Sequence, residues 1–169
     1  MDPSTVRPRV LSLCSGIGSL DLAVDLALGG VLPVCMVERE ASACALLAAH
    51  MEAQRLSPCP IWMGDIAEFP AAAFSGCVDL VVAGIPCQPH SLAGQRRGED
   101  DERWLWPEAL RCFRSVGARY LFLENVQGFV SNGLGTVLGD LASLGFDAEW
   151  GVFSAASVGA PHSRKRLFV

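Results

Sequence analysis

One cysteine differs from the other six in its surroundings. Cys87 is flanked by prolines in the segment 84–91, GIPCQPHS, which directly follows a β-rich apolar run. Open α/β sheets place their active sites just beyond the carboxyl ends of their strands. A thiol at that position is a candidate nucleophile, provided that its pKa is lowered or a base lies nearby. The alternative is a buried loop cysteine, and the remaining six are expected to be mostly buried small apolar residues.

Two glycines follow the first apolar run. Gly16 and Gly18 lie in the segment 12–19, SLCSGIGS, between an expected strand and an expected helix. Such a turn lets a ligand approach the backbone at a helix N-terminus. The third glycine of a dinucleotide-binding turn and the Gly-Lys-Ser/Thr of a P-loop are missing, which disfavours both of those sites. Together with Glu38, which ends the next apolar run and is placed to accept hydrogen bonds from a ribose diol, the glycines favour a nucleoside-containing ligand.

Two further carboxylates have a structural and a functional interpretation each. Asp65, in GDI, is by itself most simply a turn or helix-cap residue, and its functional interpretation places it near an adenine amino group. Glu124 follows the apolar run 120–123 and precedes Asn125. The two form either a helix-capping pair or part of a site in which a protonated Glu124 donates to a ring nitrogen. The local sequence favours neither interpretation of Glu124.

Basic residues are concentrated in two places. The segment 159–166, GAPHSRKR, is the densest, and Arg96 and Arg97 form a second pair. A formal net charge of -5 excludes a uniformly basic protein that wraps nucleic acid, although it does not exclude a local basic patch. A run of charge is usually a solvated face. Against an acidic background it is also suited to contact a phosphate or a base edge.

The elements that must position these residues alternate between apolar runs and helical patterns. This alternation predicts an α/β fold of three layers, with helices on both faces of a mostly parallel sheet. Strands are expected at 10–14, 34–37, 79–83, 120–123, 146–153 and 166–169, with one more before Asp65. Helices are expected at 20–28, 41–51, 106–116 and 134–144. The irregular segment 84–103 is of a length that is usually functional or mobile.

Length and composition predict the number of domains and the cellular environment of the protein. A chain of 169 residues with 51% hydrophobic residues is expected to form one domain over residues 1–169. The first ten residues contain no apolar stretch typical of a secretory signal, and no run approaches the ~18 apolar residues of a membrane span. The seven cysteines are odd in number and contain no C-x-x-C. They therefore predict neither a disulfide framework nor a metal site, and favour a reduced, cytoplasmic protein.

The motifs taken in order resemble those of the bacterial and phage DNA (cytosine-5)-methyltransferases. The matching segments cover essentially the whole chain from Val10 to Val169: LSLCSGIGSLDLA, the glutamate of MVERE, GDI, GIPCQPHSLAGQRRGEDDER, LFLENVQGF and SVGAPHSRKRLFV. The Pro-Cys-Gln segment with its continuation, followed by Glu-Asn-Val, is the most specific of these. The resemblance implies a Rossmann-like methyltransferase fold of the S-adenosylmethionine-dependent class, a final antiparallel strand, and a place in DNA methylation and restriction-modification.

The resemblance also implies a cofactor site. Gly16 and Gly18 would shape the S-adenosylmethionine pocket, Glu38 would bind the ribose, and Asp65 with Ile66 would lie at the adenine. The full set of implied cofactor-binding residues is Leu13, Cys14, Ser15, Gly16, Ile17, Gly18, Ser19, Leu20, Glu38, Arg39, Asp65, Ile66, Gly84 and Pro86. Within it, Cys14 stands where the family usually has phenylalanine and Ser19 where it has a third glycine.

For catalysis, the resemblance implies that Cys87 attacks carbon 6 of a cytosine that is flipped out of the duplex. Glu124 would protonate or hydrogen-bond ring nitrogen 3. Arg164 and Arg166 match the paired arginines of the Q-x-R-x-R motif, in which His162 replaces the glutamine. The implied contacts to substrate or DNA are Pro86, Gln88, Ser91, Arg96, Arg97, Arg103, Asn125 and Val126. Of these, the residues in 84–103 would belong to a mobile loop that closes over DNA.

The family's target-recognition domain and two further motifs normally follow the last matching segment. This chain is therefore expected to be the catalytic region alone, either a truncated form or the large part of a split enzyme whose second chain supplies target recognition. Two alternatives remain open. One is a non-catalytic module that binds cofactor or a partner. The other is a cytosine-5 methyltransferase that acts on free nucleotide or RNA.

Overall fold

The structure, a computed structural model, describes residues 7–86 and 104–169. The chain divides into two compact units. The N-terminal unit comprises residues 1–84 and 108–122, and the C-terminal unit comprises residues 85–107 and 123–169. Helix α3 (Trp106–Val116) and strand β5 (Tyr120–Val126) each contribute residues to both units.

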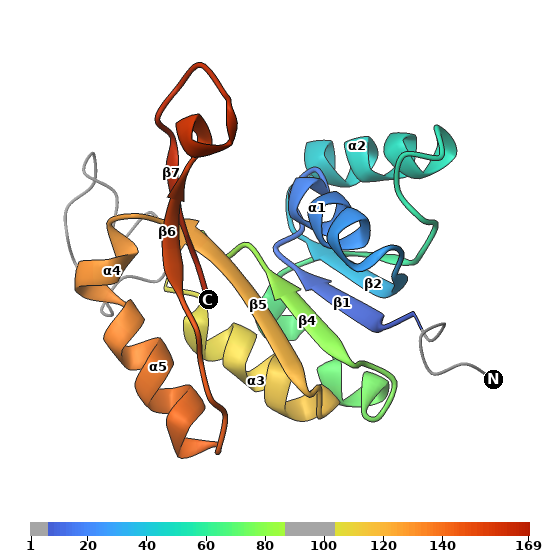
Figure 1. The fold of residues 1–169 in the computed structure, drawn as a ribbon. Helices are drawn as coiled ribbons and strands as arrows, with labels where there is room; N and C mark the ends of the chain where they lie inside the picture. The colour runs from blue at the N-terminus through green and yellow to red at the C-terminus, as the bar shows by residue number, and fades with distance from the viewer. Residues whose placement is uncertain (1–6, 87–103) are drawn as a thin grey trace. The chain divides into compact units, whose positions relative to one another are not determined.

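Four parallel strands form the framework of the N-terminal unit, in the order β3-β2-β1-β4 (Figure 1). Their bounds are β1 Arg9–Leu13, β2 Leu32–Glu38, β3 Ile61–Met63 and β4 Leu80–Ala83. Leu13 is in register with both Val37 and Ala83, and Glu38 is in register with Met63. The four strands therefore end at one common edge, and the glycine turn, Glu38, the Asp65 segment and Gly84 lie at or directly after these strand ends.

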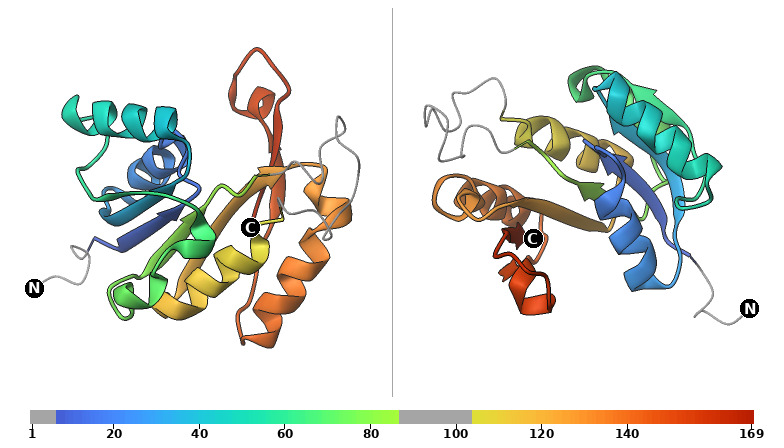
Figure 2. Two further views of the ribbon diagram at one scale, coloured as in Figure 1. Left: turned by 180° about the vertical axis from the view of Figure 1, so that it is seen from behind. Right: turned by 90° about the horizontal axis from the view of Figure 1, so that it is seen from above.

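Helices lie on both faces of these strands. Helix α1 (Ser19–Leu28) lies on one face and α3 on the other (Figures 1 and 2). On the α1 face, a buried apolar cluster connects β1 and β4 to the helix and to the residue before β2. Its members are Val10, Val24, Val31, Leu80 and Val82. Helix α2 (Ala41–Glu52) buries Leu47 against Met36 of β2. On the α3 side, Cys112, Phe113 and Val116 are fully buried.

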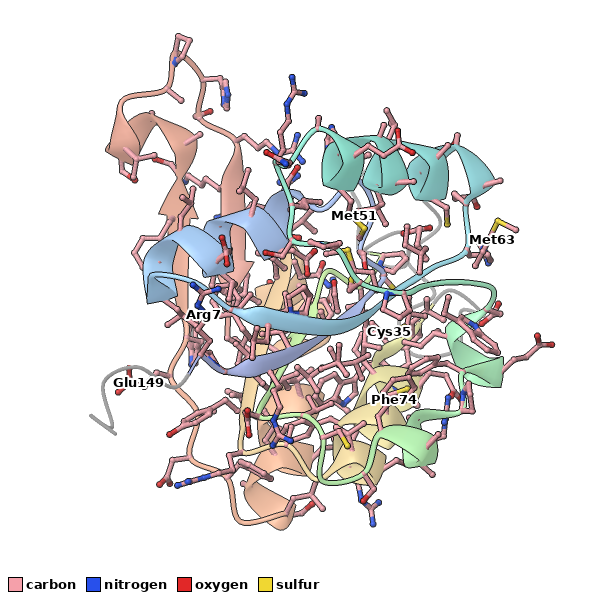
Figure 3. All side chains as sticks on the ribbon, turned by 90° about the vertical axis from the view of Figure 1, so that its right-hand side faces the viewer. Arg7, Cys35, Met51, Met63, Phe74 and Glu149 are labelled. Carbon is pink, nitrogen blue, oxygen red and sulfur yellow. The ribbon has the colours of Figure 1, made fainter. Side chains whose placement is uncertain are left out.

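The connections within this unit include two short 3₁₀ turns, η2 (Ile66–Glu68) and η3 (Ala71–Phe74). Phe69 lies between them and is 2% exposed. Its ring stacks on Phe74 with 5.4 Å between centroids and meets the edge of Trp62 at 5.7 Å. Figure 3 shows Phe74 and Cys35 among the side chains on this side of the strands. This aromatic cluster anchors the segment that follows β3.

The C-terminal unit contains an antiparallel group of strands with the order β5-β7-β6. The bounds of these two further strands are β6 Gly151–Ser154 and β7 Lys165–Phe168. The unit also contains α4 Phe129–Asn132, α5 Leu134–Ser143 and the 3₁₀ turn η6 Ala155–Val158. The indole Nε1 of Trp106 donates to the Oδ2 of Asp140 in α5 at 2.8 Å. Trp104 stacks on Phe129 with 5.5 Å between ring centroids. These contacts fix the start of α3 against the two helices of this unit.

The structure confirms the predicted α/β class and the mostly parallel strands, and it corrects several details. Strand β5 continues to Val126 because it pairs with β7, so Glu124 and Asn125 lie within a strand and do not cap a helix. Strand β6 covers only Gly151–Ser154 of the predicted 146–153, and α4 and the 3₁₀ turns were not predicted. Among the cysteines, Cys77 is exposed, because it lies in the turn before β4. Within the described residues, no helix is long and apolar enough to cross a membrane.

An ion pair joins the starts of β1 and β4. The Arg9 guanidinium donates to both oxygens of Asp79, with Nη2–Oδ1 at 2.8 Å and Nε–Oδ2 at 3.0 Å, and the Arg9 backbone N–H also donates to Oδ2 at 2.9 Å. These hydrogen bonds lower the pKa of Asp79 from its ordinary value to about 2. The pair contributes to stability at the strand ends opposite to the candidate site.

We expect Asp79→Asn to lower the free energy of unfolding at pH 7 by about 1 kcal/mol, because the side chains are partly exposed and solvent screens the pair. The pKa of Asp79 is lower in the folded than in the unfolded chain, so this stabilisation is present above about pH 4 and is lost as the pH falls toward 2. Urea unfolding at pH 7 and pH 3 measures the difference. The exposed Asp147→Asn is the control, and equal stability of the two variants at pH 7 would contradict the prediction.

Candidate functional site

The turn between β1 and α1 is held by backbone hydrogen bonds. The Ser15 N–H donates to the carbonyl of Val37 at 3.1 Å, and the Gly18 N–H donates to the carbonyl of Ser15 at 2.9 Å. Gly16 has φ +55°, and a Cβ there would meet no atom within 4 Å. Gly18 has φ +82°, and a Cβ there would lie 2.5 Å from a methyl carbon of Leu56. The turn therefore needs glycine at both positions, and open space lies beside Gly16.

Glu38, at the end of β2, holds this turn in place. Its Oε2 accepts the Gly16 N–H at 2.7 Å and its Oε1 accepts the Glu40 N–H at 2.8 Å. The residue is only 9% exposed. A buried carboxylate that accepts backbone N–H groups is fixed in orientation, and each oxygen keeps a further lone pair. Glu38 is thus suited to accept hydroxyl donors from a ligand that lies over the glycine turn.

Asp65 takes the capping role that its local sequence suggests. Its Oδ1 accepts the Ala67 N–H at 3.0 Å and so caps the η2 turn. The other oxygen, Oδ2, lies 3.8 Å from the Nη1 of Arg39, whose side chain is 68% exposed. Ile66 is buried, whereas Met63 is 65% exposed and lies at the outer side of the unit (Figure 3). Asp65 and Glu38 follow neighbouring strands at the same edge.

The other predicted cofactor residues of the N-terminal unit lie in or beside the glycine turn. Leu13 is fully buried at the end of β1, Ile17 is 46% exposed, and Ser19 begins α1. Leu20 packs on the apolar cluster beneath α1. At Gly84, after β4, a Cβ would lie 3.5 Å from the Cys14 carbonyl oxygen. The structure thus brings the turn, Glu38, Arg39, Asp65 and Gly84 to one edge of the N-terminal unit.

Cys14 lies in this turn with φ +52°. Burial raises the pKa of its thiol to about 12, and the nearby Glu38 and Asp65 carboxylates add to the increase. The thiol therefore stays protonated at neutral pH, which excludes Cys14 as a thiolate nucleophile. Among the described residues, no group of three or more His, Cys, Asp or Glu side chains is arranged to hold a metal ion.

In the C-terminal unit, the predicted catalytic residues Glu124 and Arg166 form an ion pair. The Nε of Arg166 lies 2.6 Å from the Oε1 of Glu124, and each side chain is about one quarter exposed, at 25% and 26%. The antiparallel register places Arg166 opposite Val126, which lies two residues from Glu124 on the same face of β5. Arg166 therefore reaches Glu124 along the diagonal between two strands. The guanidinium also donates from Nη1 to the Lys165 carbonyl at 3.0 Å.

Asn125 connects β5 to the segment that leads to Cys87. It is 2% exposed, and its Nδ2 donates to the Ile85 carbonyl at 3.4 Å. Its Oδ1 accepts the Val126 N–H at 2.8 Å. The exposed Pro86 follows Ile85 directly. Asn125 is therefore a structural residue that fixes the backbone two residues before Cys87.

The other predicted catalytic and DNA-binding residues either lie away from the Glu124–Arg166 ion pair or fall outside the described residues. Arg164 is exposed, and its carbonyl accepts the Ala155 N–H at 3.1 Å. Its side chain is thus at the surface, whereas Arg166 is engaged. The remaining predicted site residues lie outside the described residues; they are Cys87, Gln88, Ser91, Arg96, Arg97 and Arg103.

One residue without a motif signal contacts the candidate site. Arg111 of α3 donates to backbone carbonyls of the η2 segment, which follows Asp65. Its only local sign in the sequence is Glu108 three residues earlier, with which it forms an ion pair of 2.6 Å. Because the carbonyls are more than 40 residues away in the chain, spacing does not reveal this contact.

Comparison with known proteins identifies the family and the fold of this chain. The family model described as C-5 cytosine-specific DNA methylase matches residues 8–169. The Type II methyltransferase M.NgoMIV of Neisseria gonorrhoeae is 34% identical over 167 residues, which cover 94% of this chain and 50% of that protein. The Type II methyltransferase M.AquIA of Picosynechococcus is 29% identical over 184 residues, which cover 97% of this chain and 71% of that protein.

Among solved structures, the Dnmt2 methyltransferase of S. pombe superposes with a TM-score of 0.70 at 25% sequence identity. The match covers 96% of this chain and 50% of that one. The fold is thus the Rossmann-like fold of methyltransferases. The chain spans about half the length of M.NgoMIV and of the S. pombe protein. From the family model, which covers nearly all of its residues, the chain belongs to the C-5 cytosine-specific DNA methylase family.

Proposed function

We propose that this chain transfers a methyl group from S-adenosylmethionine to carbon 5 of a cytosine in DNA. The observation that carries the proposal is the Arg166–Glu124 ion pair of 2.6 Å on neighbouring strands, in the unit that also contains the Cys87 segment. A protonated carboxyl group can donate to ring nitrogen 3 of cytosine and a guanidinium can donate to the carbonyl oxygen, so the two side chains together suit both acceptors. Membership of the cytosine-specific methylase family supports the same substrate.

The residues at the edge of the N-terminal unit fit S-adenosylmethionine. The open space beside Gly16 leaves room for the nucleoside to approach the backbone at the start of α1. Glu38 would accept the ribose hydroxyls, and Asp65 would accept the adenine amino group. When bound, the cofactor supplies an electrophilic methyl group on a sulfonium. Cys14 to Leu20, Arg39 and Gly84 would line the same site, and Pro86 would lie next to it in the chain.

The proposed reaction uses Cys87 as a nucleophile. Its thiolate adds to carbon 6 of the cytosine, and the electron pair of the 5,6 double bond moves into the ring toward nitrogen 3 and the carbonyl oxygen. Glu124 donates a proton or hydrogen bond at nitrogen 3, and Arg166 stabilises charge on the oxygen. Carbon 5 would then take the methyl group as the methyl–sulfur bond breaks, which would leave S-adenosylhomocysteine, and nitrogen 3 would return its proton to Glu124. Loss of the carbon 5 proton to a base restores the double bond and expels the Cys87 thiolate.

The remaining predicted residues would bind DNA. Arg96, Arg97, Arg103 and Arg164 would contact phosphates, and Gln88 and Ser91 would contact the nucleotides around the flipped base. Pro86 and Val126 would border the base. Asn125 would not contact the base; it would hold the backbone before Cys87 in place by donating to the Ile85 carbonyl. We propose that the whole chain works as one catalytic and cofactor-binding domain.

A transfer assay tests the proposal. The full chain is incubated with S-adenosylmethionine carrying a tritiated methyl group and with cytosine-containing duplex DNA, single-stranded RNA or dCMP in parallel. We expect label in the DNA, recovered as 5-methylcytosine after digestion. Label in RNA or dCMP alone would overturn DNA as the substrate. Tight binding of S-adenosylhomocysteine without transfer to any of the three would instead support a non-catalytic module.

The Glu38→Gln variant tests the cofactor part of the site. An amide accepts at only one of its two polar atoms, so one of the two backbone N–H groups that Glu38 now satisfies would face an NH₂ group. We expect the Kd for S-adenosylhomocysteine to rise about tenfold. Isothermal titration calorimetry measures it, with Glu52→Gln as the control because that side chain is exposed at the end of α2. The same Kd in both variants would contradict the role of Glu38.

A further inference from the structure

Arg111 is a half-buried arginine whose guanidinium is committed to backbone oxygens. Its Nη2 donates to the Ile66 carbonyl at 2.7 Å and to the Ala67 carbonyl at 3.3 Å. Its Nη1 donates to the Phe69 carbonyl at 3.3 Å. The Nε donates to the Oε2 of Glu108 at 2.6 Å, which holds the fork in its orientation. Side-chain hydrogen bonds thus tie α3 to the whole η2 turn.

The η2 turn is a short segment with few backbone hydrogen bonds of its own. The Ile66 carbonyl accepts the Phe69 N–H at 3.2 Å and the Phe69 carbonyl accepts the Ala71 N–H at 2.8 Å, so Arg111 adds a second donor to each of these two oxygens and a donor to the Ala67 carbonyl. The planar guanidinium presents several donors in a fixed fork, which suits a set of neighbouring carbonyls. A lysine has a single charged group at the end of a flexible chain and would not hold the same three oxygens in one arrangement.

The same turn sets the orientation of Asp65. The carboxylate of Asp65 accepts the Ala67 N–H at 3.0 Å, and its carbonyl accepts the Glu68 N–H at 3.0 Å. The Nη1 of Arg39 lies 3.8 Å from the Asp65 Oδ2, but the Arg39 side chain is largely exposed and holds the carboxylate weakly. The position of the Asp65 carboxylate therefore depends on the conformation of η2, and Arg111 maintains that conformation from its carbonyl side.

We propose that Arg111 is a positioning residue for the adenine end of the cofactor site, acting through the η2 turn on Asp65. This inference rests on the proposed function, because it takes Asp65 to accept the adenine amino group. Arg111 itself does not touch the cofactor. It determines how strongly the site prefers an adenine over a base that lacks the amino group.

The test compares the binding of two ligands by calorimetry. S-adenosylhomocysteine carries the amino group, whereas S-inosylhomocysteine has a carbonyl oxygen in its place, which an aligned Asp65 carboxylate repels. We expect wild type to prefer S-adenosylhomocysteine. In Arg111→Gln the Kd for this ligand should rise about tenfold, with little change for S-inosylhomocysteine, so that the preference shrinks by the same factor. The control is Arg114→Gln, which removes an exposed arginine from the same helix and should leave both Kd values unchanged.

A merely structural role would lower stability without changing this preference, so the ratio of the two Kd values separates the two roles. If Arg111→Gln does not fold, Glu108→Gln and Arg111→Lys carry the test, with the preference reduced to a smaller extent. An unchanged preference in folded Arg111 variants overturns the inference alone, with the proposed function intact. Absence of S-adenosylhomocysteine binding by wild type overturns the cofactor site and this inference together.

Discussion

The Cys87→Ser variant is expected to lose at least about a thousandfold in the rate of methyl transfer to DNA. The proposed reaction begins with addition of a thiolate to carbon 6, and without that addition carbon 5 of cytosine is too weakly nucleophilic to take the methyl group. A serine hydroxyl is far less acidic than a thiol and is a poor nucleophile without a strong base. Binding of S-adenosylhomocysteine should not change, because the proposed cofactor residues of the N-terminal unit are intact.

Covalent capture gives an independent readout of the same step. A fluorine at carbon 5 takes the place of the proton that must leave, so the enzyme should remain attached to DNA that contains 5-fluorocytosine. We expect a DNA-linked band on a denaturing gel for wild type and none for Cys87→Ser. Cys77→Ser is the matched control, since Cys77 is an exposed thiol and should behave as wild type. Capture by the Cys87 variant, or transfer at the wild-type rate, would show that another group is the nucleophile.

The elements with strong local signals could be predicted from the sequence. Helix α3 has the predicted bounds Trp106–Val116, because Pro107 is favourable in a first turn and the apolar positions recur at helical spacing. Strand β5 was predicted too short. Glu124 and Asn125 look like a loop by their polarity, but pairing with β7, where Leu167 is fully buried, extends the strand through them. The strand propensity of the local sequence does not reveal a pairing with a strand that lies about 40 residues further along the chain.

The candidate site was predictable where it depends on strand ends and not where it depends on contacts between distant segments. The resemblance implies that Glu38 and Asp65 bind one cofactor, and the parallel strands β2 and β3 bring both residues to one edge because the carboxyl ends of parallel strands meet there. The contact from Asn125 to the Ile85 carbonyl joins positions 40 residues apart, and those from Arg111 to η2 join positions 42 to 45 residues apart. No spacing rule applies at such separations. The ion pair of Arg166 with Glu124 likewise follows from the register of β5 and β7.

The second large effect is expected for Glu124→Gln, with a fall in the transfer rate of about a hundredfold or more. The substitution keeps the shape of the side chain and removes its ability to deliver a proton to nitrogen 3. The amide can still donate a weak hydrogen bond, which is why the expected loss is smaller than that for Cys87→Ser. Initial rates at saturating cofactor and DNA measure the effect, and Glu149→Gln, an exposed substitution in the same unit, is the control (Figure 3).

Two roles of Arg166 in the ion pair can be separated by combining its substitution with that of Glu124. If Arg166 acted only by holding Glu124, then Arg166→Gln would have little effect once Glu124 had been replaced. If it also stabilises charge on the cytosine carbonyl oxygen, the double variant must be slower than Glu124→Gln by a further factor. We expect the second result, with single effects that add incompletely, because the 2.6 Å contact couples the two side chains directly. A double variant as fast as Glu124→Gln would reduce Arg166 to a positioning residue, whereas rates of Glu124→Gln equal to wild type would remove the carboxyl group from the mechanism.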